Sequence, residues 1–391
     1  MPTPVSALLH AATLVTAGVY LLIRVSPLLE FSDTVLSCIR VLGGLTAIVG
    51  GSLGLVSNDM KKVIAYSTLS QLGYITYAIG ISAYHISLYH LVNHAFFKAL
   101  LFLSAGSIIH AIKDEQDLRR MGSLKKPLIF TYVCMTIGSI SLMGFPFTTG
   151  FYSKEPILLV KYASITGGFG YILCLTAALF TAIYGARAIF AVFFAPFSIS
   201  NKKSLSSVHE GTSPTLLPLA FLGVCGVILG YGGSDYFLNG GPYTDSVFLN
   251  TVHQQRATPY FGGASLPLAL TFGGIVVAFV VYILYYKPLI RLTYSKIFKG
   301  LYVLLSQRYF FDLIFNGAVS RAVLIAGSLT SKCLDKGFGE MLGPFGLHKK
   351  TTSLSLTALP SFIRHQSPIF YGGLFIGGLF ISIFICIVLD F

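Results

Sequence analysis

The segment at residues 89–101, YHLVNHAFFKALL, decides the interpretation of this sequence, because it places three ionisable side chains within an otherwise apolar run. His90, His94 and Lys98 follow one another at intervals of four residues. On a helix these side chains share one face, and the stripe runs about 12 Å from His90 to Lys98. A lysine at mid-bilayer costs about 2.5–3.5 kcal/mol on insertion scales, so such groups generally face a wet or protein-lined interior. The pattern therefore indicates proton movement within a membrane.

The composition is that of an integral membrane protein. The 391 residues are 54% hydrophobic and only 10% charged, with a mean hydropathy of +0.77, whereas soluble domains carry about 25% charged residues. The apolar runs are long, separate and numerous, which favours a helical bundle over a β-barrel. Lys and Arg outnumber Asp and Glu by 27 to 14. Positive-inside topology explains this excess, and no aromatic–basic cluster or zinc-finger spacing supports binding to nucleic acid.

The sequence offers no recognisable site for a metal or a redox group. Its six cysteines lie singly, without a CxxC pair or a Cys/His ligand set, so we expect neither an iron–sulfur cluster nor a structural disulfide. There is also no Rossmann fingerprint or flavin motif. We therefore expect this chain to bind no cofactor of its own.

The apolar runs predict an all-α, polytopic helical bundle of about nine transmembrane helices, each near the ~20 residues that a bilayer requires. The fifth run is too long for one straight helix, and its GFPFTTG motif at residues 144–150 should break it into two half-helices. The expected crossings lie at residues 5–25, 34–56, 63–81, 85–111, 127–163, 167–195, 214–231, 266–287 and 368–389.

The loops differ in charge in a way that predicts topology. Basic residues gather after even-numbered crossings, as in Lys61, Lys62 and the run at residues 113–126, and they are scarce after odd-numbered ones. The positive-inside rule then places Met1 on the positive side, mitochondrial matrix or bacterial cytoplasm, and Phe391 on the opposite side.

Residues 301–345 are moderately apolar but carry a charge every several residues. That spacing argues against a crossing and predicts an amphipathic helix that lies along the membrane or against neighbouring subunits. A plain solvated linker is the alternative, because glycines recur at positions 317, 327, 337 and 339.

Four motifs carry a resemblance to a known family. PTPVSALLHAATLVTAGVYLLIR (2–24), NDMKKVIAYSTLSQLGY (58–74), HLVNHAFFKALLFLSAGSIIH (90–110) and GFPFTTGFYSKEPIL (144–158) resemble, in the same order, the antiporter-like, proton-pumping chain 5 of NADH:ubiquinone oxidoreductase, respiratory complex I, in its mitochondrial form. The resemblance is nearly continuous over residues 2–195 and returns weakly at 307–316 and 335–344, where the family has its lateral helix. It implies that NADH, FMN, the iron–sulfur clusters and ubiquinone are bound by other subunits.

The resemblance also implies a division of the chain and a set of partners. Family members carry about seven further helices before the first motif, so this chain looks like the C-terminal portion of a split subunit. A separate polypeptide would supply the missing N-terminal half; truncation of the sequence is the alternative. The other expected partners are membrane-arm subunits of complex I and membrane lipids, in the mitochondrial inner membrane. The expected parts are a half-channel core (1–195), peripheral transmembrane helices and loops (196–300), the amphipathic lateral helix and a connector (301–367), and a C-terminal anchor (368–391).

Lys98 is the best candidate for proton transfer. Burial disfavours the charged form of a lysine, which makes a switch between charged and neutral states possible near the working pH. Matched to the family, Lys98 is the central channel lysine. His94 and His90 extend the stripe, and a neutral histidine can accept a proton on one ring nitrogen and donate from the other. A lysine paired within a structural network, or histidines that merely fill the core, are the alternatives.

Four further residues are candidates mainly through the resemblance. Lys154 and Glu155 follow the expected helix break, where the family has its exit-side lysine and a neighbouring acid; anchoring at the membrane interface is the alternative. The resemblance makes His10 a link between two half-channels. Lys62 matches a family position implicated in proton entry, although positive-inside anchoring also explains it.

The sequence thus predicts a proton-translocating subunit of complex I, driven by quinone reduction on other subunits. As such it would be part of an enzyme, the proton-translocating NADH:ubiquinone reductase, without a redox centre of its own. A subunit of a multisubunit cation/proton antiporter, whose large chain shares the motifs, is the first alternative. A purely structural module with vestigial channel residues is the second.

Overall fold

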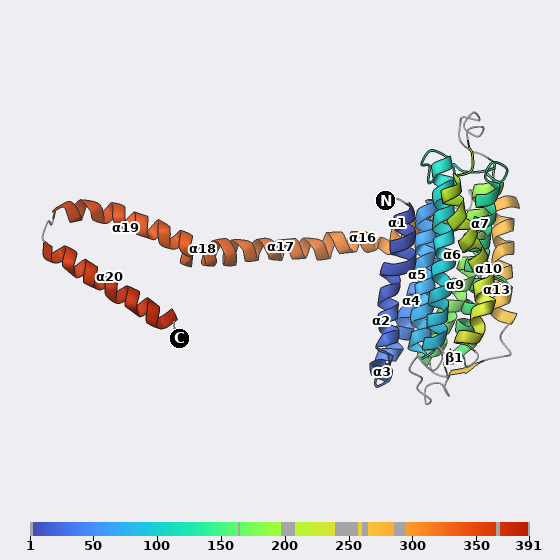
Figure 1. The fold of residues 1–391 in the computed structure, drawn as a ribbon, viewed down its shortest axis with the longest axis horizontal. Helices are drawn as coiled ribbons and strands as arrows, with labels where there is room; N and C mark the ends of the chain where they lie inside the picture. Colours follow the sequence, from blue (N-terminus) through green and yellow to red (C-terminus); the bar gives the residue numbers. More distant parts are fainter. Residues whose placement is uncertain are drawn as a thin grey trace. The chain divides into compact units, whose positions relative to one another are not determined.

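The computed structural model describes residues 3–162, 165–196, 208–238, 257–259, 265–284, 295–364 and 368–389. These residues divide into two compact units, residues 1–309 and 310–391. The first unit is a bundle of long, roughly parallel helices (Figure 1). The second is a series of helices joined end to end. Each unit is described by itself.

The bundle contains several helices whose lengths suit a membrane crossing, together with shorter ones. Its first helix begins with α1 (Thr3–Ser6), continues through a wider π-helical stretch (Ala7–Thr13) and ends with α2 (Leu14–Arg24). The elements that follow are α3 (Ser26–Leu29), α4 (Asp33–Val56), α5 (Met60–Gly80), α6 (Tyr84–Ala111), α7 (Ile129–Met143), α8 (Thr149–Leu159), α9 (Ile165–Ile189) with its π-helical extension (Phe190–Phe194), α10 (Ser213–Phe237), α13 (Ser265–Phe279) with its own extension (Val280–Leu284), and α15 (Lys296–Ser306).

Small residues let α4 and α5 approach so closely that their backbones touch. A Cβ atom on Gly43 would lie 2.4 Å from the backbone nitrogen of Tyr77, and one on Gly73 would lie 2.4 Å from that of Ala47. Helix–helix interfaces in membranes are enriched in such small residues, because contact between backbones replaces the hydrophobic drive that is missing in lipid. Glycine is therefore required at both positions.

The expected break in the fifth crossing is confirmed. α7 ends at Met143 and α8 begins at Thr149, and Gly144 between them adopts a left-handed conformation with φ of +82°. Gly150, one residue into α8, lies so close to the preceding helix that a Cβ atom would be 1.7 Å from the Ser141 carbonyl oxygen. Glycine is thus needed on both sides of the turn that separates the half-helices.

Two three-residue strands depart from the expected all-helical picture. β1 (Val160–Tyr162), directly after α8, pairs antiparallel with β2 (Ala257–Pro259). They lie at the end of the bundle where α3 also lies (Figure 1). The rest of the described secondary structure is helical, so the fold class stands as a helical membrane bundle.

The loops predicted to share the positive side do meet at one end of the bundle. Backbone hydrogen bonds join Leu118 to Asn58 (2.8 Å) and Ser123 to Ala195 (2.9 Å), so the loops that follow α4, α6 and α9 pack together. Arg187 reinforces this end by donating from its guanidinium to the Leu55 carbonyl and to Asn58 Oδ1. The loops that loop charge assigned to one side of the membrane thus pack together at one end of the bundle.

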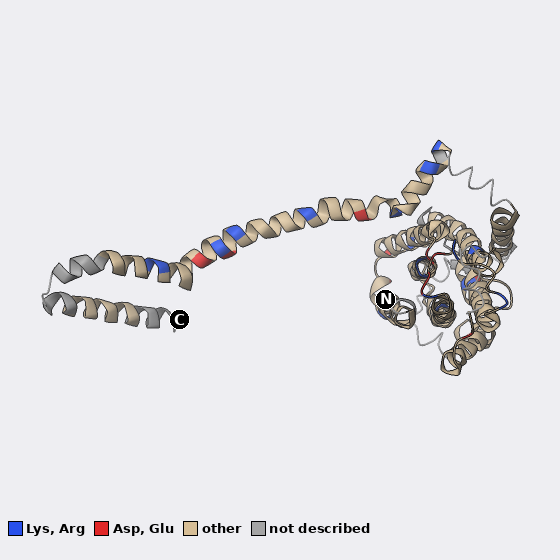
Figure 2. Ribbon diagram, turned by 90° about the horizontal axis from the view of Figure 1, so that it is seen from above, with Lys and Arg blue, Asp and Glu red and all other residues tan. Residues whose placement is uncertain are grey.

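The second unit follows a kink at residues 308–310, where Arg308, Tyr309 and Phe310 all have positive φ. Figure 2 shows charged residues spaced along its helical run. Its elements are α16 (Phe311–Ile314), a π-helical stretch (Phe315–Ser320), α17 (Arg321–Thr330), a second π-helical stretch (Ser331–Gly339), α18 (Glu340–Leu342), α19 (Pro344–Arg364) and α20 (Pro368–Leu389).

Seven helices among the described residues are long and apolar enough to cross a membrane. Six of them correspond to crossings expected from the sequence. The other three expected crossings are the 21-residue α5, the broken pair α7 and α8, and α20. The seventh helix is Arg308–Leu342. The charge spacing of residues 301–345 was expected to argue against a crossing, but this helix is long and apolar enough for one. Its most apolar stretch carries no more than two charges, which is within the range of a membrane helix.

Candidate functional site

Lys98 is fully buried in the middle of the bundle. α6 carries it and contacts α5, α7, α8 and α10, so the lysine is enclosed by helices. Its ammonium Nζ donates to the Ser67 hydroxyl and, over 3.4 Å, to the Ile64 carbonyl oxygen, both on α5. Neither partner is a carboxylate. Because only neutral groups accept from it, the amine can exist charged or neutral without leaving an unpaired anion.

The two histidines of the stripe are also fully buried and differ in their hydrogen bonds. His90 Nδ1 lies 2.9 Å from Ser153 Oγ on α8, and its Nε2 lies 3.1 Å from Gln71 Oε1 on α5. His94 makes no hydrogen bond through either nitrogen within the described residues. A buried imidazole without partners is costly, and ordered water is the usual way in which such groups are satisfied. His94 is thus the position in the stripe that calls for water.

Lys154 and Glu155 follow the helix break, as expected. Lys154 is only 2% exposed. Its Nζ donates to Thr181 Oγ1 over 2.9 Å and to the Met143 carbonyl, which the end of α7 leaves free of a helical partner, over 3.4 Å. The same Nζ lies 5.2 Å from the centre of the Tyr74 ring, a cation–π distance. Glu155 is half-buried beside it.

The structure brings the three residues of the stripe and Lys154 together. Ser153 contacts His90 and is the neighbour of Lys154 in α8, so the histidine end of the stripe meets the helix break. The buried side chains of Lys98, His94 and His90 on α6 and of Ser153 and Lys154 on α8 are here called the buried line, and a hydrogen bond between His90 and Ser153 joins its two parts. Sequence spacing predicted that Lys98, His94 and His90 lie together. The packing of α8 on α6 brings Lys154 to them.

Lys62 lies elsewhere, at the surface. Its side chain is 56% exposed and its ammonium is 3.8 Å from Asp59, whose carboxylate also caps the start of α5. A cleft of about 450 Å³ opens beside it, lined in part by Glu115, Asp117 and Arg308. The structure therefore does not place Lys62 in the buried line, and it lies instead at the mouth of a cleft at the end where the basic loops meet.

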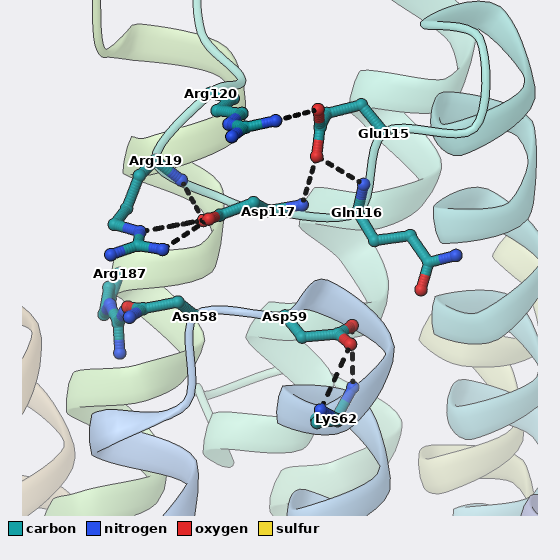
Figure 3. A network of polar contacts seen from close by, with 9 residues as sticks. All are labelled: Asn58, Asp59, Lys62, Glu115, Gln116, Asp117, Arg119, Arg120 and Arg187. Atoms are coloured by element: carbon teal, nitrogen blue, oxygen red, sulfur yellow. Dashed lines mark hydrogen bonds and ion pairs between the residues drawn. The ribbon is translucent and has the colours of Figure 1, made fainter. Parts of the chain in front are cut away.

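The loop above Lys62 carries two exposed ion pairs (Figure 3). Arg119 holds Asp117 through three side-chain hydrogen bonds, and Arg120 holds Glu115 at 3.1 Å. The hydrogen bond from Arg120 lowers the pKa of Glu115, and that from Arg119 lowers the pKa of Asp117. Both carboxylates are therefore ionised at neutral pH and give this cleft a mixed charge.

The remaining candidate, His10, lies in the π-helical stretch of the first helix. Its side chain is outside the described part of the structure, so its proposed role is not tested here. Among the residues that the structure describes, no group of three or more His, Cys, Asp or Glu side chains is placed to hold a metal ion.

Sequence reasoning missed several polar residues around this line. Thr181, the partner of Lys154, lies 27 positions further along the chain, and an ordinary helix-packing threonine would look the same in sequence. Arg40 is buried within α4, where it donates to the Gly80 carbonyl at the end of α5 over 2.9 Å. Its charge within an apolar run was a signal that could have marked it as functional or structural.

Fold and site together define a class. The chain is a multi-pass helical membrane protein with a broken helix at depth and lysines and histidines buried along the bundle interior, an arrangement found in ion and proton pathways. Comparison with known proteins agrees. Residues 1–183 match the model of the transmembrane family "NADH:quinone oxidoreductase/Mrp antiporter, TM".

Among the curated relatives that the chain is similar to are several NADH-ubiquinone oxidoreductase chain 5 proteins. The present chain is 43% identical to that of Rhizopus stolonifer over 387 residues, covering 95% of this chain and 58% of the relative. It is 44% identical to that of Phytophthora infestans over 354 residues, covering 88% and 53%. The chain thus spans just over half the length of these curated relatives.

A solved structure shows the same fold. The Mrp complex from Dietzia sp. DQ12-45-1b contains a chain that aligns with 94% of this one at a TM-score of 0.60 and 23% identity, and 39% of that chain is covered. At this identity the similarity speaks for the fold alone.

Proposed function

We propose that the chain is a proton-translocating component of the membrane arm of NADH:ubiquinone oxidoreductase. Protons would move along Lys98, His94, His90 and Lys154 in response to quinone reduction on other subunits. The observation that carries the proposal is the buried line itself, in which, among the described residues, Lys98 donates to neutral groups and His94 has no hydrogen-bond partner. The homology to chain 5 proteins supports the assignment to complex I.

The remaining candidates take subsidiary roles in this proposal. Glu155 stabilises the charged form of Lys154 from the adjacent position. Lys62 and its cleft receive protons at the end of the bundle where the basic loops meet. His10 connects this half-channel to the part of the subunit that the chain does not span. NADH, FMN, the iron–sulfur clusters and ubiquinone are bound by other subunits, and this chain contributes no redox centre.

Replacing Lys98 tests the proposal. The Lys98→Ala and Lys98→Met variants should assemble into the complex but lower the number of protons pumped per electron, measured in sealed vesicles with NADH as the donor. The control is Lys126→Ala, which removes a lysine from the exposed loop before α7. Full pumping by an assembled Lys98 variant would refute the relay.

We also propose that a second polypeptide completes the subunit. The first helix, Thr3–Arg24, has only 31% of its apolar window buried, and its exposed face carries Leu14 and Leu21, each more than 60% exposed. A partner that packs on this face would supply the half of the chain 5 fold that the relatives have in addition. Leu14→Cys should then form a cross-link to that polypeptide within the purified particle, and Leu217→Cys on α10 should not. Mass spectrometry that finds no such polypeptide would contradict the split.

The charge pattern supports an orientation. We propose that the chain lies in the mitochondrial inner membrane with Met1 on the matrix side and Phe391 on the intermembrane-space side, since the basic loops after α4, α6 and α9 meet at one end. In this arrangement residues 301–367 would form the lateral helix and connector that brace neighbouring subunits, and residues 368–391 would anchor their far end. A cysteine at Lys126 should react with an impermeant maleimide only after the inner membrane is opened.

An antiporter subunit is the second candidate function, favoured by the fold shared with a chain of the Mrp complex. Composition of the particle separates the two. Flavin and NADH dehydrogenase activity that co-purify with the chain support complex I, whereas a particle that exchanges sodium for protons without them supports the antiporter.

A further inference from the structure

α10 makes hydrogen bonds to both half-helices of the broken crossing, and the proposed relay gives it no role. The Ser141 hydroxyl, near the end of α7, donates to the Gly226 carbonyl at 3.0 Å. The Thr149 hydroxyl, at the start of α8, donates to the Cys225 carbonyl at 2.9 Å. The backbone amide of Gly230 donates to the same Thr149 oxygen at 3.2 Å. One short stretch of α10 thus holds a residue on each side of the break.

The contact between α10 and α8 is also a close one between backbones. A Cβ atom on Gly230 would lie 2.5 Å from the Thr149 Cα atom, so glycine is required there. The carbonyl of Gly230 also accepts from the Tyr89 hydroxyl of α6. Small residues and hydrogen bonds between helices are what join helices in membranes, where the hydrophobic drive is missing. α10 is therefore joined to both helices that carry the buried line.

The hydrogen bonds of Lys154 depend on the geometry of the break. Lys154 is carried by α8, but its ammonium donates at 3.4 Å to the carbonyl of Met143 at the end of α7. Ser141 shares the last turn of α7 with Met143, and Thr149 begins α8. A shift of one half-helix against the other would change the distance from the ammonium to this carbonyl. The bonds from α10 oppose such a shift, because they hold both half-helices to one helix.

We propose that Thr149 is a positioning residue for Lys154. Together with Ser141 it holds the break against α10, which keeps the ammonium within hydrogen-bond distance of the Met143 carbonyl. Neither hydroxyl takes up or releases a proton in this role. α10 then belongs functionally to the half-channel, although the sequence predicted that residues 196–300 are peripheral. The inference rests on the proposed relay function, in which Lys154 is a member of the buried line.

The test is the number of protons pumped per electron by the assembled complex carrying Thr149→Val. Valine has nearly the shape of threonine but lacks the hydroxyl, and with it the bonds to Cys225 and Gly230. Because a misplacement of about 1 Å can cost about 10²-fold in rate, we expect the variant to lose at least about half of the pumping that Lys154→Ala loses. Thr149→Ser keeps the hydroxyl and should pump at nearly the parental ratio.

The control is Thr131→Val on α7. Thr131 is as fully buried as Thr149, but its hydroxyl donates to the Leu128 carbonyl at the start of its own helix. This variant should keep the parental ratio of protons to electrons. A change that only weakened the fold would lower the yield of assembled complex and leave this ratio unaltered in the particles that remain. Assembled Thr149→Val particles with the parental ratio, or an equal fall in the control, would overturn the inference.

A second variant decides the matter if Thr149→Val fails to assemble. Ser141→Ala removes a single bond to α10 and should lower the ratio in the same direction by a smaller amount. Parental pumping by an assembled Ser141→Ala complex would contradict the inference. Full pumping by Lys154→Ala would refute the relay at Lys154, and the inference with it. If Lys154→Ala lowers pumping and both hydroxyl variants behave like the parent, only the present inference fails.

Discussion

α6 and the helix Arg308–Leu342 have the same mean hydropathy in their most apolar windows, yet they differ in how much of that window is buried. In α6, 61% of the most apolar window is buried, whereas in the run of the second unit none is. Hydropathy alone therefore does not distinguish a helix that is packed within a bundle and carries a buried site from a helix whose side chains are exposed. The difference lies in the neighbours: α6 is packed against the first helix and against α5, α7, α8 and α10, and many of its polar side chains are buried there.

The positions of glycine sharpen this comparison and give the largest expected effect. Gly73→Ala places a methyl group against the backbone of α4, because its Cβ atom would lie 2.4 Å from the Ala47 nitrogen. We expect a cost above the usual ~1–3 kcal/mol of overpacking and loss of the assembled complex on native gels. Gly327→Ala, with nothing within 4 Å, should leave assembly intact and favour the helix by about 0.5–1 kcal/mol. Equal assembly of the two variants would contradict the difference in packing.

The same comparison applies to charge and proton movement. His94→Leu removes the buried imidazole that has no hydrogen-bond partner in the described part of the chain, and we expect proton pumping to fall about tenfold or more while the complex still assembles. Lys332→Leu removes a basic residue from the exposed run and should leave pumping unchanged. Measurement of protons pumped per NADH oxidised decides between them. Similar losses in both variants would mean that pumping does not depend specifically on the buried line.

A moderate loss of stability is expected on changing Arg187, which joins α9 to the end of α4 by hydrogen bonds. Arg187 donates to the Leu55 carbonyl and, over 2.7 Å, to Asn58 Oδ1, and its guanidinium stacks on Tyr282. Arg187→Lys keeps the charge but loses the forked geometry, so we expect a loss of about 1–3 kcal/mol. The temperature at which the complex dissociates should fall. Arg120→Lys, in an exposed ion pair, is the control and should change it little.

The smallest effect concerns pH. The pKa values of Glu115 and Asp117 are lowered by their arginines, so the stability they contribute is complete above the unfolded values near 4 and is lost as pH falls through the lower folded values. Exposed pairs of this kind contribute about 0–1 kcal/mol. The dissociation temperature of a Glu115→Gln, Asp117→Asn variant should differ from the parent by a small, constant amount between pH 5 and 8. A difference in dissociation temperature that changes between pH 5 and 8 would contradict the lowered pKa values of the two carboxylates.

The sequence predicted local features well, because spacing determines them. The interval of four residues between His90, His94 and Lys98 placed them on one helix face, and the proline and the two glycines at residues 144–150 predicted the break. Both follow from helix geometry and backbone sterics alone. The loops after α4, α6 and α9, which loop charge assigned to one side, also pack together in the structure.

Contacts between distant parts of the chain could not be predicted in the same way. Arg187 lies more than a hundred positions from Leu55, and its hydrogen bond to the Leu55 carbonyl exists only once α9 packs beside α4. The exposed position of Lys62 depends on where α5 begins, which Asp59 fixes by capping the helix. For residues 301–345, charge spacing alone predicted that the segment does not cross the membrane. The length and composition of the helix Arg308–Leu342 are nevertheless those of a possible crossing.

The claim on which the account depends is that the buried line is hydrated, and an experimental density map of the assembled particle that resolves ordered water tests it most directly. We expect water hydrogen-bonded to His94 and continuous with the ammonium of Lys98, enclosed by protein on every side. A map in which His94 is packed dry among apolar side chains, or in which Lys98 points toward lipid, would contradict it.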